Sequence, residues 1–157
     1  MRIGLGIDAH QLVRNRSLRL GGVEVPHVKG LEGHSDGDVL LHAIASALLG
    51  ALGDGDLGTH FPSSDPSLEG IDSGEILRQV MARVRQAGFK LGNVDATLIA
   101  EEPRLAVHLP KLRTSVAALL NTPEDRVNIK ATSTDRMGAI GRGEGIGAQA
   151  VVLLEDA

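Results

Sequence analysis

With 157 residues, 42% of them hydrophobic, the chain is predicted to form one domain, residues 1–157, around an ordinary hydrophobic core. It contains no cysteine, which excludes disulfides, iron–sulfur clusters and thiolate zinc sites, so any bound metal must be held by His, Asp and Glu side chains. A net charge of −4 with interspersed signs, only two phenylalanines as aromatic residues, and no apolar run near the roughly 20 residues that span a bilayer argue against nucleic acid and membrane partners.

The N-terminal part of the chain is predicted to form β-strands. Met1 to Gly4 lacks the character of a signal or transit peptide, so we expect a cytoplasmic protein. From Arg2 to Asp8 the residue types alternate with period 2, which predicts a strand. Leu18 to Pro26 is predicted to form a hairpin about Gly21-Gly22. Gly4 to Ala9 also fits a loose dinucleotide-binding fingerprint, but its glycines lie within the strand pattern and no helix follows, so we do not expect a pyrophosphate site there.

A central helix is predicted over Asp38 to Leu52. Its apolar residues recur at helical spacing and widen to almost the whole circumference, which is typical of a helix buried in the middle of a domain. Ser35 or Asp36 is the expected N-cap, and Asp38 suits the positive end of the helix dipole. Gly53 can end the helix in the left-handed conformation.

The rest of the chain alternates loops, helices and strands. Asp54 to Ser73 is rich in Gly, Pro, Ser and Asp and is long for a loop in a compact domain, which indicates a functional or disordered segment. The further predicted elements are a helix over Gly74 to Ala87 closed by Gly88, a strand over Val94 to Ala100, a helix over Leu105 to Leu120 with Pro110 in its first turn or breaking it, and strands over Val127 to Thr132 and Ala148 to Glu155 separated by the glycine-rich Gly138 to Gly147.

Three side chains have the spacing of a metal site. Asp8 and His10 lie two residues apart at the end of the first strand, so both leave the same face. With His42, one turn into the central helix, they form a set of two histidines and one carboxylate, the pattern of a catalytic zinc ion with one open position. The alternative is a capping aspartate beside a surface histidine. The remaining histidines without such a context, expected to be solvated or hydrogen-bonded, are His27, His60 and His108.

A second polar segment could bind phosphate. Lys130 to Arg136 places hydroxyl groups after a predicted strand, and Arg142 follows in the glycine-rich segment. Taken alone, these residues would be read as a Ser/Thr turn with a solvated arginine.

Taken together, the motifs of the chain resemble those of the 2-C-methyl-D-erythritol 2,4-cyclodiphosphate synthase family, an enzyme family of the non-mevalonate isoprenoid pathway. The resemblance extends over essentially the whole chain and rests on the order and spacing of short motifs. These are Asp8-Ala9-His10, His34-Ser35-Asp36-Gly37-Asp38, His42, Gly55-Asp56-Leu57-Gly58, Phe61-Pro62 with Asp65-Pro66, Gly92-Asn93-Val94-Asp95, Lys130-Ala131-Thr132 and Gly141-Arg142-Gly143-Glu144-Gly145.

The resemblance implies an α/β fold of the α+β kind, with helices on one face of a mixed four-stranded sheet. It also implies a homotrimer in which the sheets surround the three-fold axis and the active sites lie between subunits.

The resemblance further implies a metal-dependent, cyclising lyase reaction. Its small-molecule substrate is 4-diphosphocytidyl-2-C-methyl-D-erythritol 2-phosphate, and its products are the 2,4-cyclodiphosphate and CMP. Zn²⁺ would be bound by Asp8, His10 and His42, and a second ion, Mg²⁺ or Mn²⁺, by Asp135. Because the substrate's own 2-phosphate is the nucleophile, no protein nucleophile is needed and catalysis becomes positioning plus charge neutralisation.

By the same resemblance, His34 and Ser133 are the expected catalytic residues. The expected substrate contacts are Asp8, Ala9, His10, His34, Ser35, Asp56, Leu57, Gly58, Phe61, Pro62, Ser63, Ser64 and Asp65 around the erythritol phosphate, and Ala100, Glu101, Glu102, Pro103, Arg104, Leu105, Ala106, Ala131, Thr132, Ser133, Thr134, Asp135 and Arg142 around the cytidine and diphosphate.

Three positions depart from the family pattern. Arg104 replaces a lysine, Ala139 replaces an aromatic residue facing the trimer's central cavity, and Asp135 replaces a glutamate. Two other functions are compatible with the same residues, a zinc-dependent phosphoesterase and a non-catalytic trimer that binds cytidine nucleotides.

Overall fold

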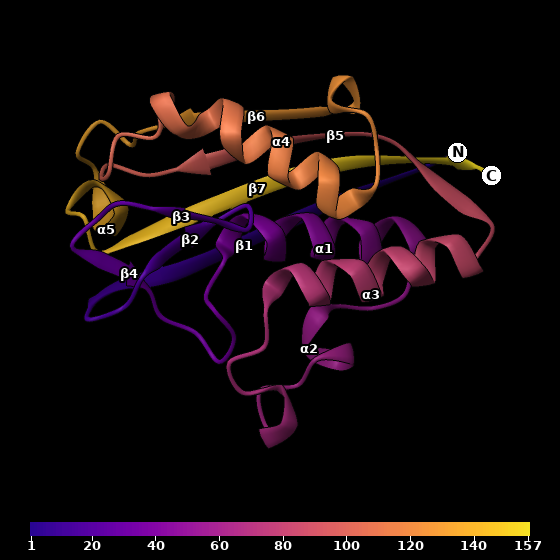
Figure 1. Cartoon of the computed structure of the whole chain (residues 1–157), viewed down its shortest axis with the longest axis horizontal. Helices are drawn as coiled ribbons and strands as arrows, with labels where there is room; N and C mark the ends of the chain where they lie inside the picture. Colours follow the sequence, from indigo (N-terminus) through magenta and orange to yellow (C-terminus); the bar gives the residue numbers. More distant parts are fainter.

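A mixed five-stranded sheet forms one layer of the computed structural model, which describes residues 1–157 (Figure 1). Its strands lie in the order β4-β1-β7-β5-β6, where β5 and β6 are parallel and all other neighbours are antiparallel. β2 and β3 form a separate hairpin about Gly21-Gly22, as predicted. The strand bounds are β1 Arg2–Arg14, β2 Leu18–Leu20, β3 Val23–Val25, β4 Lys29–Leu31, β5 Phe89–Ile99, β6 Val127–Thr132 and β7 Gly145–Asp156.

The prediction of four strands in the main sheet is wrong, because the sheet has a fifth strand at its edge. β4 has only three residues, and it pairs with the end of β1 from Leu12 to Arg14. Three residues are too few to show a strand periodicity in the sequence. β1 itself continues to Arg14 rather than ending at Asp8, so Asp8 and His10 lie within the strand. The mixed character of the sheet is confirmed.

The glycines of β1 allow the central helix to lie directly on the strand. Gly4 and Gly6 are buried, and a Cβ atom at either position would overlap the backbone carbonyl oxygen of Ala47 or Ala43 in α1. The loose fingerprint at Gly4 to Ala9 therefore reflects close packing of a strand against a helix, in agreement with the rejected pyrophosphate site. The apolar residues that alternate with these glycines project from the opposite, exposed face of the sheet.

α1 is the central helix, as predicted, and nearly all of its side chains are buried. The predicted N-cap is wrong: neither Ser35 nor Asp36 caps α1, because the side chain of Asp38 accepts the N–H of Leu41. All three residues have capping side chains, so the sequence alone could not select among them. Gly53, with φ of 70°, ends the helix in the left-handed conformation as predicted.

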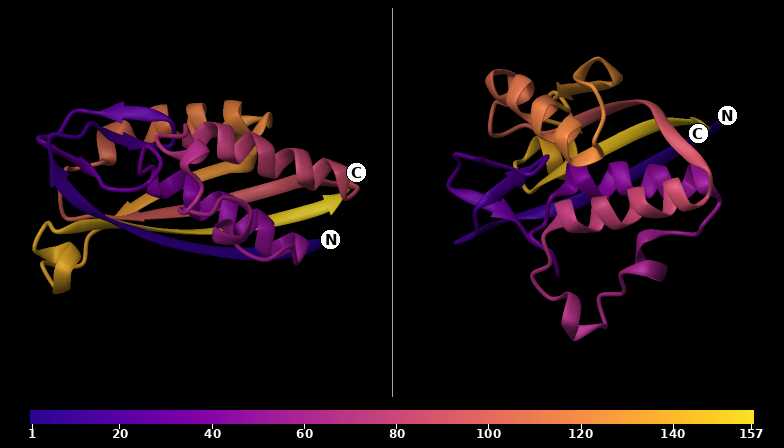
Figure 2. Two further views of the ribbon diagram at one scale, coloured as in Figure 1. Left: turned by 90° about the horizontal axis from the view of Figure 1, so that it is seen from below. Right: turned by 45° about the vertical axis from the view of Figure 1, so that its right-hand side comes forward.

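The long helices α1, α3 and α4 all cover one face of the main sheet, which confirms the predicted arrangement (Figure 2). α3 begins and ends one residue before its predicted bounds, and Pro110 lies in the first turn of α4, after a short 3₁₀ turn. The helix bounds are α1 Val39–Leu52, α2 Leu57–His60, α3 Ser73–Gln86, α4 Leu109–Leu120 and α5 Gly138–Gly141, with 3₁₀ turns at Pro66–Leu68, Ala106–His108 and Glu124–Arg126.

The remaining differences from the prediction concern element ends. β6 has its predicted bounds, whereas β5 begins at Phe89 instead of Val94 and β7 begins at Gly145 instead of Ala148. Asp54 to Ser73 holds α2 and a 3₁₀ turn and extends away from the sheet at the bottom of Figure 1.

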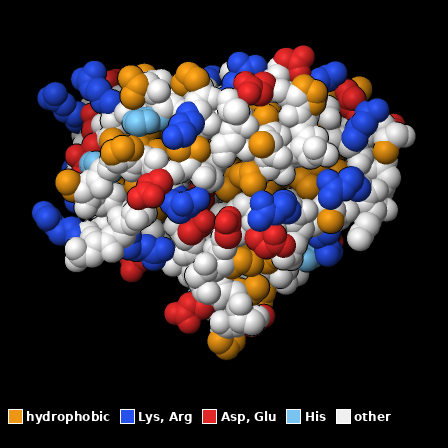
Figure 3. Space-filling model, in the orientation of Figure 1, with side chains coloured by type: hydrophobic (Ala, Val, Ile, Leu, Met, Phe, Trp, Pro, Cys, Tyr) orange, Lys and Arg blue, Asp and Glu red, His pale blue; other side chains and the backbone are white.

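Acidic and basic side chains are interspersed on the surface shown in Figure 3 rather than gathered into one basic patch. None of the helices combines the length and the apolar character needed to cross a membrane.

Candidate functional site

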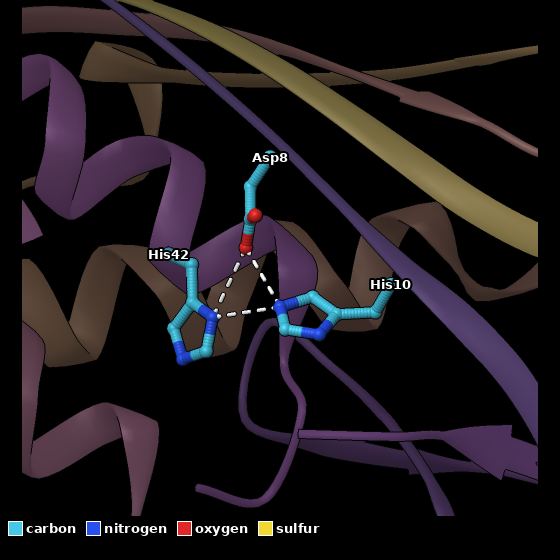
Figure 4. A group of neighbouring side chains, drawn as sticks. All are labelled: Asp8, His10 and His42. Carbon is cyan, nitrogen blue, oxygen red and sulfur yellow. Dashed lines mark hydrogen bonds and ion pairs between the residues drawn. The ribbon is translucent and has the colours of Figure 1, made fainter. Parts of the chain in front are cut away.

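β1 and α1 bring Asp8, His10 and His42 together, as the sequence predicted (Figure 4). Oδ2 of Asp8 lies 2.8 Å from Nε2 of His10 and 3.1 Å from Nδ1 of His42, and these two ring nitrogens are 3.1 Å apart. The side chains are 28%, 19% and 12% exposed, so the group is partly open on one side. Asp8 and His10 leave the same face of β1, and His42 comes from α1, which packs on that face. We call these three residues the three-donor group.

Each histidine also has an oxygen partner on its other ring nitrogen. Nδ1 of His10 lies 2.6 Å from the carbonyl oxygen of Glu32, and since a carbonyl can only accept, Nδ1 of His10 donates. In the neutral ring Nε2 therefore keeps its lone pair, whereas the protonated ring also donates from Nε2 to Asp8. Nε2 of His42 lies 2.9 Å from Oγ of Ser73 and 3.1 Å from Oγ of Ser35. Both rings are thus held by polar contacts on the side away from Asp8.

The electrostatics of the group favour an ionised carboxylate. Burial raises the pKa of the Asp8 carboxyl group, but hydrogen bonds with His10 and His42, reinforced by the charges of these rings, outweigh burial and hold the pKa well below its usual range. The hydrogen bond to Asp8 raises the pKa of His10, with burial acting in the opposite direction. A negative charge therefore stands between the two imidazoles.

The geometry fits a divalent cation. The three donor atoms form a triangle with edges of 2.8, 3.1 and 3.1 Å. Donors bound to a tetrahedral zinc ion at about 2.0–2.1 Å lie roughly 3.3 Å apart, so a shift of a few tenths of an ångström would accommodate the ion. Metal-bound histidines almost always donate their other N–H to an oxygen, and both rings here have such a partner.

The three-donor group lies in a cavity of about 470 Å³ between β1, α1 and the segment from Asp54 to Ser73. His34 and Ser35, two of the predicted substrate contacts, line this cavity, and Nε2 of His34 lies 3.2 Å from the carbonyl oxygen of Asp65. The cavity is lined by Ile7, Asp8, His10, His34, Ser35, His42, Ser46, Leu57, Gly58, Phe61, Ser63, Leu68, Ile71 and Ile76.

The predicted contacts of the long loop are thus only partly brought to the cavity. Leu57, Gly58, Phe61 and Ser63 line it, whereas Pro62 and Ser64 do not. Asp56 instead caps α2 by accepting the N–H and the hydroxyl of Thr59. Asp65 caps the 3₁₀ turn at Pro66–Leu68 in the same way, through Ser67.

The predicted cytidine contacts form a second region, at the carboxyl ends of the parallel strands β5 and β6. Ile99 pairs with Thr132, and the N–H of Ala100 donates to the carbonyl oxygen of Thr132 at 2.9 Å. Ala100 therefore lies beside Thr132, and Oε2 of Glu101 accepts the N–H of Arg136 at 3.3 Å. That residues 100–106 and 131–135 form a shared cytidine pocket, as the family resemblance implied, stays a prediction. None of these residues lines the cavity of the three-donor group.

Two charged residues expected at the diphosphate, Asp135 and Arg142, do not line the cavity of the three-donor group. Asp135 is exposed, does not belong to the three-donor group, and has a positive φ of 52°. Arg142 forms a two-pronged ion pair with Glu144, at 3.2 and 3.0 Å, and this carboxylate raises the pKa of the arginine. Nζ of Lys130 lies 2.7 Å from Oδ2 of Asp95, across β5 and β6.

The histidines outside the site differ in their contacts. His60 is hydrogen-bonded to the carbonyl oxygen of Asp54, as expected for such a residue. His27 departs from this expectation, because its Nε2 is buried without a hydrogen-bond partner and lies 3.8 Å from Oε1 of Glu102. His108 is half-buried at the start of α4.

Sequence reasoning missed two residues behind His42. Ser73 is fully buried at the start of α3, and Asp36, expected to cap α1, instead accepts hydrogen bonds from the backbone and hydroxyl of Ser73. The pair is 37 residues apart in sequence. Only Asp72, which caps α3, and Glu75 in its first turn mark this helix start in the sequence, and neither signal points to His42.

Comparisons with known proteins find similarity over the whole length of the chain. A family model described as the YgbB family matches residues 1–155. The 2-C-methyl-D-erythritol 2,4-cyclodiphosphate synthase of Geotalea uraniireducens is 55% identical over 155 residues, which cover 99% of each chain.

Two solved structures superpose closely on this chain. A 2C-methyl-D-erythritol-2,4-cyclodiphosphate synthase in its CDP-bound form has a TM-score of 0.91 and 38% identity, over 98% of this chain and 100% of the other. The bifunctional IspDF of Campylobacter jejuni has a TM-score of 0.96 and 39% identity over 99% of this chain, which spans only 42% of the length of that protein.

Proposed function

The chain belongs to the YgbB family of 2-C-methyl-D-erythritol 2,4-cyclodiphosphate synthases, and we propose that it carries out the family's reaction with a divalent metal bound by Asp8, His10 and His42. It converts 4-diphosphocytidyl-2-C-methyl-D-erythritol 2-phosphate to 2-C-methyl-D-erythritol 2,4-cyclodiphosphate and CMP, a step of non-mevalonate isoprenoid synthesis. The observation that carries the metal proposal is the three-donor group inside a cavity lined by His34 and Ser35.

The reaction exchanges one P–O bond for another and is therefore a lyase-type cyclisation without water. An oxygen of the 2-phosphate attacks the β-phosphorus, the bond from this phosphorus to the bridging oxygen breaks, and CMP leaves with that oxygen. When bound, a divalent ion supplies positive charge that polarises phosphoryl oxygens. Zinc suits the donor set of two imidazoles and a carboxylate.

The side chains of the cavity would position the two reacting phosphates. His34 and Ser35 stand at the cavity wall near the three-donor group, where they can donate hydrogen bonds to the erythritol phosphate. The long loop supplies an apolar wall through Leu57 and Phe61, which suits the methylerythritol carbon chain. Charge neutralisation and orientation account for the catalysis, so no side chain has to act as a nucleophile.

The cytidine and the second metal belong to the second region. We propose that residues 100–106 and 131–135 bind the cytidine through backbone groups, without an aromatic platform. The contact of Ala100 with Thr132 at the ends of β5 and β6 supports this. We propose that the hydroxyl of Ser133 helps to orient the diphosphate. Asp135 would hold Mg²⁺ or Mn²⁺ there, since a carboxylate is an oxygen donor suited to these ions.

We propose that the two regions are united by assembly of a homotrimer. The cavity with the three-donor group and the ends of β5 and β6 are separate in one chain, and a composite site would complete each cavity with a neighbour's cytidine region. The exposed apolar side chains on the outer face of β1 favour an interface at the sheet.

A product assay tests the function. The protein is incubated with the diphosphocytidyl substrate in H₂¹⁸O, with and without a chelator, and the products are identified by mass spectrometry. The expected result is the cyclic diphosphate and CMP without ¹⁸O, lost on chelation and restored by zinc. Incorporation of ¹⁸O would instead identify a phosphoesterase, and CMP binding without turnover a non-catalytic nucleotide-binding protein.

A further inference from the structure

The ring of His42 faces two hydroxyl groups on the side away from Asp8. Nε2 of His42 is 2.9 Å from Oγ of Ser73 and 3.1 Å from Oγ of Ser35, and the two hydroxyl oxygens are 3.4 Å apart. A hydroxyl can donate or accept, so it does not by itself decide which nitrogen of His42 carries the proton. This differs from His10, whose partner is a carbonyl oxygen that can only accept.

The carboxylate of Asp36 decides which nitrogen of neutral His42 is expected to carry the proton. The hydroxyl of Ser73 donates its only proton to Oδ1 of Asp36, and the N–H of Ser73 donates to Oδ2 of the same carboxylate at 3.1 Å. With its proton used in this way, Oγ of Ser73 can only accept, and the nearest group that can donate to it is Nε2–H of His42, at 2.9 Å.

The carboxylate of Asp36 is itself held in place. Its Oδ1 also accepts the N–H of Asp38 at 3.1 Å, and Nε of Arg19 lies 3.8 Å from its Oδ2. Ser73 is fully buried, so water does not compete with these bonds.

The hydroxyl of Ser35 could favour the other tautomer of neutral His42. Oγ of Ser35 accepts the N–H of Gly37 at 3.2 Å, and in the absence of substrate its own proton can go either to Oγ of Ser73 or to Nε2 of His42. Donation to Nε2 would require the opposite tautomer, with the proton on Nδ1, which would then donate to Oδ2 of Asp8 at 3.1 Å. Ser73 and Asp36 oppose this tautomer, because it would turn the lone pair of Nε2 toward the lone pairs of the Ser73 hydroxyl. That tautomer has no lone pair on Nδ1 for a metal.

We propose that Ser73 and Asp36 are positioning residues of the metal site, which keep the proton of neutral His42 on Nε2 and so leave Nδ1 free to bind the metal. The proposal rests on the proposed function of Asp8, His10 and His42 as metal ligands. It assigns to the start of α3 a role in metal binding, although neither residue is itself a metal donor and only Ser73 contacts a member of the three-donor group, His42.

The first test is the tautomer of His42 in the intact wild-type chain. The ¹⁵N shifts of the ring, recorded without metal at a pH where the ring is neutral, distinguish Nε2–H from Nδ1–H. We expect the Nε2–H form. A wild-type protein in which neutral His42 carries its proton on Nδ1 overturns the proposal, and this measurement does not depend on the folding of any variant.

The second test compares Ser73→Ala with Ser67→Ala. Ser67 is a matched control because its hydroxyl also donates to a carboxylate, that of Asp65 at 2.7 Å, but does not contact His42. Loss of an outer hydrogen bond to a metal-binding histidine typically weakens metal binding about 10–100-fold. We expect this loss of zinc affinity in Ser73→Ala, measured by competition with a chelating dye, together with a shift of His42 toward the Nδ1–H form.

Unchanged zinc affinity and an unchanged tautomer in a folded Ser73→Ala protein would overturn the proposal. Failure of the proposed function has a different signature: the wild-type chain would bind no zinc, whereas the tautomer measurement would still report on Ser73 and Asp36. Ser67→Ala should match wild type in both measurements.

Discussion

At the scale of single residues, the carboxylate of Asp38 holds together the start of α1 and the turn between β2 and β3. It is fully buried and accepts three backbone N–H groups, from Leu41 at 3.1 Å, Gly21 at 2.9 Å and Gly22 at 2.7 Å. The sequence indicated a favourable charge at this helix end. It could not indicate the contact with the hairpin, because the two segments lie apart in the chain and meet only through tertiary packing.

Asp38→Asn should destabilise the protein by about 1–3 kcal/mol, because its NH₂ group would replace one acceptor oxygen and leave a buried backbone N–H without a partner. The free energy of unfolding in urea is the measurement. Asp125→Asn is the control, since Asp125 is exposed. A change for Asp38→Asn no larger than that of the control would contradict this account of the cap.

At the scale of elements, the position of the three-donor group depends on how closely α1 approaches β1. His42 comes from the helix, and Asp8 and His10 come from the strand, so any change in the spacing of the two elements separates the donors. The buried glycines of β1 set this spacing.

Gly6→Ala should therefore affect stability and metal binding together. The added methyl group would meet the carbonyl oxygen of Ala43, which is backbone and can move only with α1, so we expect a loss of about 1–3 kcal/mol and weaker zinc binding. Gly50→Ala in α1 is the matched control, because its nearest neighbour would be 3.6 Å away and alanine favours a helix. If Gly6→Ala binds zinc as tightly as wild type, the spacing of β1 and α1 does not control the site.

β5 and β6 are joined by an ion pair whose contribution should depend on pH. The hydrogen bond from Lys130, opposed by slight burial and aided by Asn128, lowers the pKa of Asp95 in the folded state. A lowered folded pKa means that stabilisation is present above the unfolded pKa of about 3.9 and is lost as the pH falls through the folded value.

Asp95→Asn should thus cost no more than about 1 kcal/mol at pH 7, as is usual for an exposed pair, and the difference from wild type should shrink below about pH 4. Urea unfolding at pH 7 and pH 3 measures it. A difference that is the same at both pH values would show that the charge of Asp95 is not its cause.

Elements with a long, regular pattern were predicted well from the sequence, and contacts between distant segments were not. α1 could be predicted because fifteen residues, from Asp38 to Leu52, repeat at helical spacing, and β6 because its alternation has clear ends. β4 could not, since three residues show no period. The three-donor group followed from strand alternation and family resemblance, whereas the role of Ser73 required knowing that α3 starts behind His42.

At the scale of the whole molecule, the outer face of the sheet carries a strip of exposed apolar side chains. Ile3, Leu5 and Ile7 of β1 are 71%, 54% and 67% exposed, and Val151 of β7, which pairs with Leu5, is 38% exposed. A contiguous apolar strip of this kind is typical of a protein–protein interface. It lies opposite the helices, so burying it against other copies would leave α1, α3 and α4 in place.

The proposed homotrimer with composite sites predicts that two inactive variants can restore activity to each other. His42→Ala removes a metal ligand, and Thr132→Glu places a negative charge at the ends of β5 and β6, so each homogeneous protein should be inactive. In mixed trimers, a site regains activity when its metal ligands come from a Thr132→Glu chain and its cytidine region from a His42→Ala neighbour.

With equal amounts and random assembly, about one quarter of all sites should meet this condition, since each of the two contributing chains is of the required kind half of the time. In purified mixed trimers, from which both homotrimers are removed, the expected fraction is about one third, because one of the three sites always has the required pair of chains. Co-expression with different tags, purification of mixed trimers and the CMP-release assay measure the recovery, and sedimentation measures the mass of the assembly. Each variant expressed alone is the control for residual turnover. Mixed trimers without any recovered activity would place both residues of a site in the same chain, and a fully active monomer would exclude shared sites altogether.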